Sequence, residues 1–166
     1  MKNILIIDTG GTFNKIIPKT GRKTIVDDSA IALKKIALHW RCNFELITMI
    51  SKDSLDMTQH DRLELLMAIN SNDYNFVVIV HGTDTMDITA EYLAQAEIEK
   101  SVILTGSMVP FNTDPIEATA NFASAYGYIN ALSDENEGVY IAMNGIIEPY
   151  KNIVKDHGKA KFVFQK

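Results

Sequence analysis

Cysteine, long hydrophobic segments and clustered positive charge are all scarce in this sequence. Cys42 is the single cysteine, which excludes an internal disulfide framework and is typical of proteins in a reducing compartment. No apolar segment approaches the ~20 residues of a transmembrane helix. The apolar run at residues 4–7 is too short for a signal peptide, and Asp8 ends it. We therefore expect a cytoplasmic protein with no membrane partner.

The charge balance and the motifs that are missing exclude further classes of protein. The formal net charge is −5, whereas a nucleic-acid-binding surface needs clustered Lys and Arg. The most basic segment, residues 15–23, holds four cations and no aromatic residue, which is typical of a solvated loop. The four histidines lie far apart, and neither a GxGxxG motif nor a P-loop lysine is present. We expect no nucleic acid, no metal and no cofactor.

What the sequence does contain is a regular alternation of two patterns. A chain of 166 residues with 46% hydrophobic content suits one globular domain. Short continuous apolar runs are typical of strands that are covered on both faces. They occupy residues 4–7, 44–50, 76–80, 102–104 and 139–143.

Helical signals lie between these runs. Leu33, Ile36, Ala37 and Trp40 follow the i, i+3, i+4, i+7 spacing of an amphipathic helix. Thr58 with an acid three residues later predicts the start of a second helix. The segment Asp114-Pro115-Ile116-Glu117 predicts the start of another, which runs to about residue 132 and is rich in small residues that favour close packing on a sheet.

Alternating strands and helices predict an α/β fold with a doubly wound, mostly parallel sheet flanked by helices in three layers. In such folds ligands bind beyond the carboxyl ends of the strands. The residues that follow each apolar run are therefore the candidates for a functional site.

Two of these segments combine glycine with hydroxyl groups. After the first run, Gly10 and Gly11 permit a tight turn that leaves backbone N–H groups exposed to an anion or oxyanion, and Thr12 follows. After the third run, His81-Gly82 precedes Thr83 and Asp84, a hydroxyl beside a carboxylate, which is typical of an activated nucleophile. The alternatives are a plain turn at the first segment and a helix cap by Asp84 or Thr85 at the second. His81 is expected to be a hydrogen-bonded structural residue at the strand end.

The other segments are less specific. The polar residues 53–58 lead into a helix, so capping accounts for much of them. Thr105-Gly106-Ser107 again places a hydroxyl in a turn, and Asn144 follows the last run. Lys155 stands alone, and a lone lysine is usually a surface charge. Together these segments indicate a small polar substrate and favour acyl chemistry.

The same segments, in the same order, resemble the motifs of the bacterial-type L-asparaginases. They are Thr9-Gly10-Gly11-Thr12, Ser54-Leu55-Asp56-Met57, His81-Gly82-Thr83-Asp84-Thr85-Met86, Thr105-Gly106-Ser107-Met108 with Pro110, and Met143-Asn144 with Lys151 and Lys155. The hexapeptide that starts at His81 is fairly specific, whereas the first motif is not. The resemblance extends over essentially the whole chain.

The resemblance implies a chemistry and a set of roles. Thr12 would be the nucleophile that attacks the side-chain amide of L-asparagine or a related small amide, giving the acid and ammonia. Thr83, Asp84 and Lys155 would form a second catalytic cluster, in which Lys155 raises the basicity of the Thr83 hydroxyl and Asp84 orients Lys155. The resemblance also implies a homodimer or higher homo-oligomer, and these residues as contacts for an amino-acid substrate: Gly11, Ser54, Asp56, Gly82 and Ser107.

The sequence departs from the family pattern in three places. The family's lid usually carries a catalytic tyrosine, but residues 13–28 contain none, and Phe13-Asn14-Lys15 stand where small residues usually follow. Lys151 replaces the usual arginine. The sequence ends at Lys166, so we expect a single domain over residues 1–166 without the family's C-terminal domain. The alternative functions are a non-catalytic amino-acid-binding module and a truncated remnant of an asparaginase.

Overall fold

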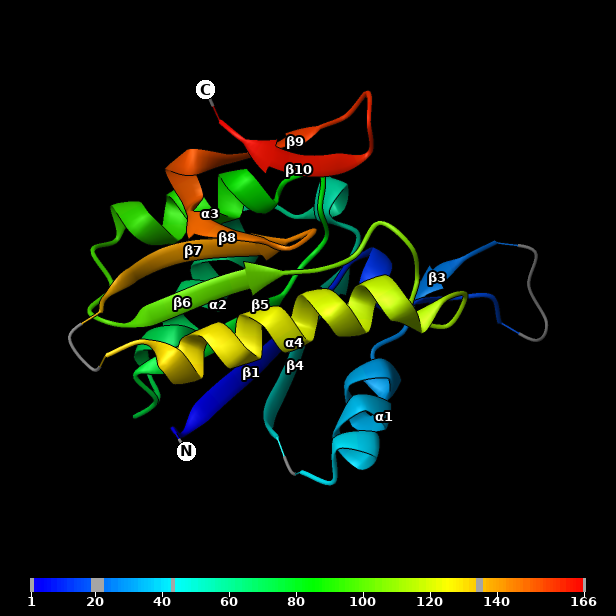
Figure 1. Cartoon of the computed structure of the whole chain (residues 1–166), viewed down its shortest axis with the longest axis horizontal. Coiled ribbons are helices and arrows are strands. Elements are labelled where there is room, and N and C mark those ends of the chain that lie inside the picture. Colours follow the sequence, from blue (N-terminus) through cyan, green and yellow to red (C-terminus); the bar gives the residue numbers. More distant parts are fainter. Residues whose placement is uncertain (1, 19–22, 43, 134–135, 166) are drawn as a thin grey trace.

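A six-stranded sheet forms the centre of the molecule (Figure 1). The computed structural model describes residues 2–18, 23–42, 44–133 and 136–165. Across the sheet the order is β4 (Glu45–Lys52), β1 (Ile4–Gly10), β5 (Phe76–Val80), β6 (Ser101–Thr105), β7 (Gly138–Met143) and β8 (Ile146–Pro149). The first five strands are parallel and β8 pairs antiparallel with β7. This confirms the predicted fold and all five predicted strands.

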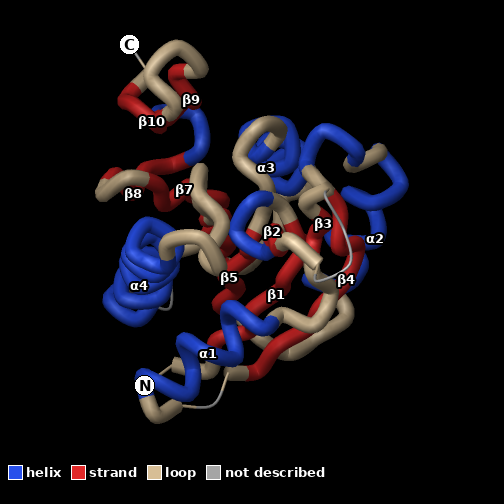
Figure 2. The backbone as a smooth tube through the Cα atoms, turned by 90° about the vertical axis from the view of Figure 1, so that its right-hand side faces the viewer, coloured by secondary structure: helices blue, strands red, loops and turns tan. Residues whose placement is uncertain are grey.

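Helices cover both faces of this sheet, which makes three layers (Figure 2). One face carries α1 (Ile31–Trp40) and α4 (Pro115–Ala131), and the other carries α2 (Gln59–Asn70) and α3 (Met86–Gln95). No helix in the described part of the chain is long and apolar enough to cross a membrane.

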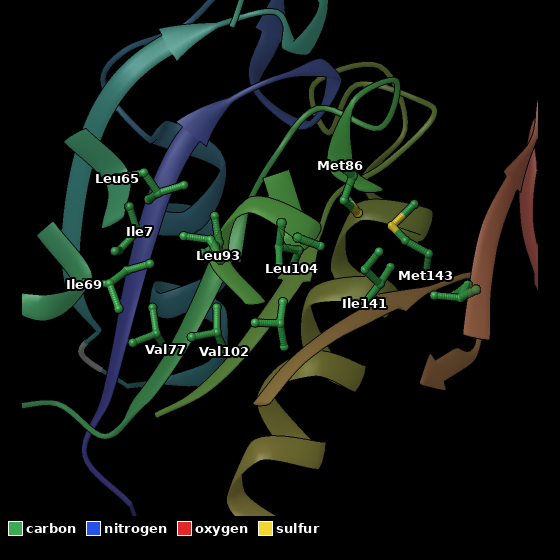
Figure 3. Packing of buried hydrophobic residues seen from close by; sticks show 14 of the residues in the cluster. Ile7, Leu65, Ile69, Val77, Met86, Leu93, Val102, Leu104, Ile141 and Met143 are labelled. Carbon is green, nitrogen blue, oxygen red and sulfur yellow. The ribbon is translucent and has the colours of Figure 1, made fainter. Parts of the chain in front are cut away.

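Because both faces are covered, alternate residues of each strand enter two separate cores. Leu5 and Ile7 of β1 pack on the side of α2 and α3, whereas Ile4 and Ile6 pack on the side of α1 and α4. Figure 3 shows the first of these cores, in which Leu65 comes from α2 and other side chains from α3 and the strands. Burial on both sides explains why the strands read as continuous apolar runs.

The predicted helix starts are present with their expected bonds. The Thr58 hydroxyl accepts the backbone N–H of Asp61, and the Asp61 carboxylate accepts that of Thr58, which is a reciprocal capping box for α2. The Asp114 carboxylate caps α4 by accepting the N–H of Ile116, and Pro115 is the first helical residue. The buried side of α4 combines the small residues Ala118 and Ala125 with Phe122 and Ile129.

The shortest elements have no periodic pattern and were not predicted. They are β2 (Lys15–Ile16), β3 (Ile25–Val26), β8, β9 (Ile153–Asp156), β10 (Lys161–Phe164) and the 3₁₀ turns η1 (Thr12–Asn14), η2 (Ser54–Asp56) and η3 (Tyr150–Asn152). The β9–β10 hairpin lies at the top of Figure 1, outside the main sheet. It is anchored by Ile153 and Phe162, which are buried in the core formed by α2 and α3.

The strand order also locates a ligand site. From β1 the chain passes to β4 on one side and then returns to β5 on the other. This topological switch point leaves a crevice between the loops that follow β1 and β5, which is where open α/β sheets bind ligands. The residues at that crevice are Gly10–Asn14 and His81–Thr85.

The capping box gives a first test of the fold. We expect Thr58→Ala to lower the free energy of unfolding by about 1 kcal/mol, because α2 loses a side-chain cap. Thr58→Ser keeps the hydroxyl and is the matched control. Urea unfolding of the three proteins measures the difference. An unchanged midpoint for the alanine variant would contradict the structural role of this box.

Candidate functional site

The loops after β1 and β5 touch through two glycines. Gly11 has φ +77°, and a Cβ placed there would lie 2.4 Å from the Cα of Gly82. No side chain fits at such a distance, so the two backbones meet directly. Thr12 and Thr83 each follow one of these glycines and therefore lie at the same edge of the sheet, as predicted.

The loop after β4 completes this arrangement. A Cβ on Gly82 would lie 2.6 Å from the Cβ of Ser54. The Ser54 hydroxyl accepts the backbone N–H of Asp84 at 3.2 Å, and the Thr85 hydroxyl donates to the Ser54 carbonyl at 2.8 Å. Three segments that are far apart in the sequence thus form one hydrogen-bonded unit at the carboxyl end of the sheet.

Lys155 reaches this unit from the β9–β10 hairpin. Its ammonium nitrogen lies 2.9 Å from the Thr83 hydroxyl and 2.5 Å from a carboxylate oxygen of Asp84. The Lys155 side chain is 13% exposed, so it is not an ordinary surface charge. Asp84 does not cap α3, because the N-cap position is Thr85 and no side chain caps that end.

The hairpin is held in place by two asparagines. The backbone N–H of Phe162, which is opposite Lys155 in the hairpin, donates to the Asn144 side-chain oxygen at 2.9 Å. The Asn144 backbone N–H donates to the Asn121 side-chain oxygen at 3.0 Å, and the Asn121 amide donates to the Gly106 carbonyl at 2.9 Å. Sequence reasoning missed Asn121, since one polar residue in a small-residue helix gives no signal.

Arg62 was also missed, because a charged residue in a helix is usually exposed. It is buried, and its guanidinium donates to the hydroxyls of Thr89 and Thr85 and to the carbonyl of Met57. All three acceptors are uncharged. Arg62 thereby joins α2 to the start of α3, directly beneath the loop that carries Thr83 and Asp84.

The remaining predicted residues are arranged more loosely. Ser107 is buried and its hydroxyl donates to the Val109 carbonyl at 2.6 Å, within its own loop. The next residue, Met108, brings this loop to the cluster, since its sulfur lies 3.5 Å from the Thr83 hydroxyl. Asp56 is exposed at the end of η2. Thr12 is half-buried, and its hydroxyl has no hydrogen bond to any residue that the structure describes.

The expectation of free N–H groups at the first glycine turn was wrong for the two glycines themselves. The Gly10 N–H donates to the Asp8 carboxylate at 3.1 Å, and the Gly11 N–H donates to the Lys52 carbonyl at 2.9 Å. The reason is an irregularity in the pairing of β1 with β4. There Ile50 and Ser51 adopt positive φ angles, and Lys52 lies beside Gly10.

Beneath this turn lies a buried carboxyl group that the sequence did not single out. Asp8 is 1% exposed, and one of its oxygens accepts the Asn14 side-chain amide at 2.6 Å. Burial raises the pKa of Asp8 from 3.8 to about 7, against the hydrogen bonds from Gly10 and Asn14. Its second oxygen has no hydrogen-bond partner among the described residues.

His81 is a structural residue, as expected. It is fully buried at the end of β5, and its Nδ1 is 2.7 Å from the Gly82 carbonyl. Burial lowers the pKa of His81 to about 4, so the ring is neutral in the folded protein at neutral pH. A neutral ring that donates from Nδ1 fixes the orientation of the glycine turn.

The fold and the site together define a doubly wound α/β protein with hydroxyls, carboxylates and a lysine at its switch point. The particular family follows from comparison with known proteins. The family model "Asparaginase, N-terminal" matches residues 3–166, so the chain belongs to the asparaginase family. This confirms the resemblance seen in the motifs.

Relatives and solved structures agree with this assignment. The glutaminase-asparaginase of Pseudomonas aeruginosa is 28% identical over 156 residues, which cover 87% of this chain and 42% of that protein. L-asparaginase 2 of Escherichia coli is 28% identical over 168 residues, covering 93% and 47%. The crystal structure of a probable cytoplasmic L-asparaginase from Campylobacter jejuni matches with a TM-score of 0.83 at 26% identity, covering 99% of this chain and 54% of that one. The chain thus spans about half the length of the relatives it matches.

The contact between the two glycines gives a second test. We expect Gly11→Ala to destabilise the protein by at least about 1–3 kcal/mol, because the new methyl group meets the Gly82 backbone and φ is positive. Gly127→Ala is the matched control, since that exposed helical glycine has nothing within 4 Å, and it should stabilise by up to about 1 kcal/mol. Thermal unfolding distinguishes the two. Equal effects of the two substitutions would contradict the close approach.

The buried Asp8 gives a pH-dependent test. Its folded-state pKa is raised from 3.8 to about 7, so the stability present below pH 4 is lost as the pH rises towards 7. The variant Asp8→Asn cannot ionise. We expect its advantage over the wild type to grow from near zero at pH 4 to the order of 4 kcal/mol above pH 7. Urea unfolding across this range measures the difference, with the exposed Asp28→Asn as control, and parallel curves for wild type and Asp8→Asn would contradict it.

Proposed function

We propose that this chain is an asparaginase-type amidohydrolase, which hydrolyses the side-chain amide of L-asparagine or a related small amide to the acid and ammonia. The observation that carries the proposal is the contact of Lys155 with both the Thr83 hydroxyl and the Asp84 carboxylate. Lys155 lies more than 70 residues away from both in the sequence. A mostly buried lysine in hydrogen-bond contact with a hydroxyl group, beside a ligand-binding crevice, is an arrangement suited to proton transfer.

In the proposed mechanism Thr12 is the nucleophile. Its hydroxyl attacks the amide carbon, ammonia leaves, and water then hydrolyses the acyl-enzyme to the acid. Lys155, which lies 2.9 Å from the Thr83 hydroxyl, raises the basicity of the Thr83 oxygen, and that oxygen takes the proton of Thr12 and passes it to the leaving ammonia. Asp84 holds the lysine nitrogen in position at 2.5 Å. The free Thr12 hydroxyl fits a nucleophile, which must be available to the substrate.

The amino-acid part of the substrate is assigned to the neighbouring residues. Asp56 and Asp84 supply carboxylates for its α-amine. The Ser54 oxygen already accepts the Asp84 N–H, so its own proton remains to be donated to the α-carboxylate. Gly82 has no side chain, so the substrate can approach its backbone closely. Ser107 lies in the neighbouring loop after β6. Gly11 allows the Gly82 backbone to approach, and its own N–H is bonded to the Lys52 carbonyl.

The names of the relatives support this class of reaction. They include glutaminase-asparaginases, an L-asparaginase and a glutamyl-tRNA(Gln) amidotransferase chain from Methanococcus maripaludis, which is 29% identical over 151 residues. Each of these names refers to asparagine or glutamine, the two amino acids with a side-chain amide. Self-association and the cytoplasmic location stay predictions from the sequence.

Substitution of the two key groups tests the mechanism. We expect Thr12→Val and Lys155→Met each to lower the turnover of any amide that the protein hydrolyses by at least about tenfold, because both groups act in the transition state. The control is Lys161→Met, which removes an exposed lysine from the same hairpin. Ammonia release under steady-state conditions is the measurement. A wild-type rate in either variant would remove that residue from the mechanism.

A second experiment compares binding with turnover. Residues 13–28 lack a tyrosine, and no described residue orients the Thr12 hydroxyl, whereas the residues assigned to the amino acid are present. Losing orienting groups around a nucleophile costs orders of magnitude in rate. We therefore expect this chain to bind aspartate in a calorimetric titration, but to hydrolyse asparagine well below the rate of the L-asparaginase relatives assayed in parallel.

The outcomes of this comparison separate the functions. A rate that equals the relatives' would show that the chain builds a complete site. Binding of aspartate with no hydrolysis of any amide would favour the amino-acid-binding module. No binding of any amino acid would favour a remnant without a functional site.

A further inference from the structure

The segment that carries Thr12 is closed on itself by two buried side chains. Asp8 ends the regular part of β1, and Asn14 ends η1. The Asn14 amide donates to Asp8 Oδ1 at 2.6 Å, and the same oxygen accepts the Gly10 N–H at 3.1 Å. The result is a ring of residues 8–14 with Thr12 inside it. Asn14 is 3% exposed, so this pair is enclosed by the protein.

Two atoms of this pair lack partners. Asp8 Oδ2 and Asn14 Oδ1 are buried, and neither has a hydrogen bond to any described residue. Buried polar atoms are nearly always hydrogen-bonded, and leaving them unpaired is costly. Both atoms are acceptors while Asp8 is ionised, so they cannot bond to each other in that state. A single proton on Asp8 Oδ2 changes this, because it turns one of the two acceptors into a donor.

The charged surroundings also disfavour an ionised Asp8. Asp27, which leads towards α1, acts on it with the same sign of charge. Two lysines of the neighbouring segments are paired with other carboxylates: Lys15 lies 2.5 Å from Asp53, and Lys52 lies 2.7 Å from Asp61.

The residues paired with Asp8 in the sheet carry no charge. On β5 its neighbour is Val80, and on β4 it is Thr48. The buried residues of α1 are apolar, namely Ala32, Leu33 and Ile36. Burial accordingly raises the pKa of Asp8 to about 7.

From this juxtaposition we infer that Asp8 is protonated and pairs with the Asn14 side chain through two hydrogen bonds, and that this acid–amide clamp positions Thr12 for reaction. In the pair, the Asn14 amide donates to Asp8 Oδ1 and the acid proton on Oδ2 is donated to Asn14 Oδ1. Asp8 and Asn14 are positioning residues here, since neither is placed in contact with the substrate. The catalytic part of the inference rests on the proposed function.

The clamp explains how Thr12 is held without a partner for its own hydroxyl. Its segment is fixed at both ends by the pair, and in the middle by the Gly11 N–H bond to Lys52. A segment of seven residues fixed at three points leaves the Thr12 backbone little freedom. Pre-ordering a nucleophile in this way lowers the entropic cost of reaching the transition state.

Carbon-13 NMR of the intact chain tests the clamp without any need for activity. We expect the Asp8 carboxyl signal to titrate with a midpoint near 7, and the Thr12 methyl signal to shift with the same midpoint. In Asp8→Asn the Thr12 signal should stay at its low-pH position throughout, because asparagine can form the same two bonds. Asp28→Asn removes an exposed acid nearby and should leave both titrations unchanged. An Asp8 that is already ionised at pH 5, or a Thr12 methyl signal that does not shift as Asp8 titrates, would overturn the inference.

Kinetics test the positioning role. We expect Asn14→Ala and Asp8→Ala to lower kcat at least about tenfold with KM changed less than about threefold, and Asp8→Asn to restore kcat. If Asp8→Ala does not fold, Asn14→Ala carries the test. Wild-type kcat in Asn14→Ala would refute the positioning role. If the wild type hydrolyses no amide, the proposed function fails, while the NMR titrations still decide whether the clamp exists.

Discussion

The backbone contact between Gly11 and Gly82 is the constraint on which the site depends. It brings the loops after β1 and β5 closer than any pair of side chains would allow, and it does so at the point where the sheet order reverses. Gly82 also lies against Ser54, and this second contact positions the loop after β4. Hydroxyls and carboxylates from three segments then lie at one edge of the sheet, because the carboxyl ends of parallel strands all meet there.

Lys155 joins this edge through a different kind of support. The β9–β10 hairpin is not part of the sheet, and its position depends on burial of Phe162 and on hydrogen bonds through Asn144 and Asn121. These bonds run from the hairpin through the turn after β7 to the loop after β6. The lysine is therefore placed by backbone and amide groups that have no role in the chemistry themselves, so its geometry is set before a substrate arrives.

Several polar groups beneath the site are buried, which costs folding free energy. The titrations of two of them, His81 and Asp8, change the stability in opposite directions as the pH falls. The folded-state pKa of His81 is lowered to about 4, so stability falls as the pH drops below 6.5. The folded-state pKa of Asp8 is raised to about 7, so its contribution to stability rises as the pH drops over much of the same range. Arg62 is buried with its guanidinium hydrogen-bonded to uncharged oxygens. Buried groups with shifted pKa values beneath a crevice are typical of functional sites.

The sequence by itself determined the five parallel strands, the capped starts of α2 and α4 and the edge of the sheet where the site lies. These features follow from local patterns: apolar runs, caps and glycines. Only the tertiary structure decided that Lys155 is enclosed on Thr83 and Asp84, that the Gly10 and Gly11 N–H groups are already bonded, and that Asp8 is a buried acid paired with Asn14. Whether a polar residue is exposed, paired or isolated depends on neighbours that are distant in the chain, and the charge it carries depends on that burial.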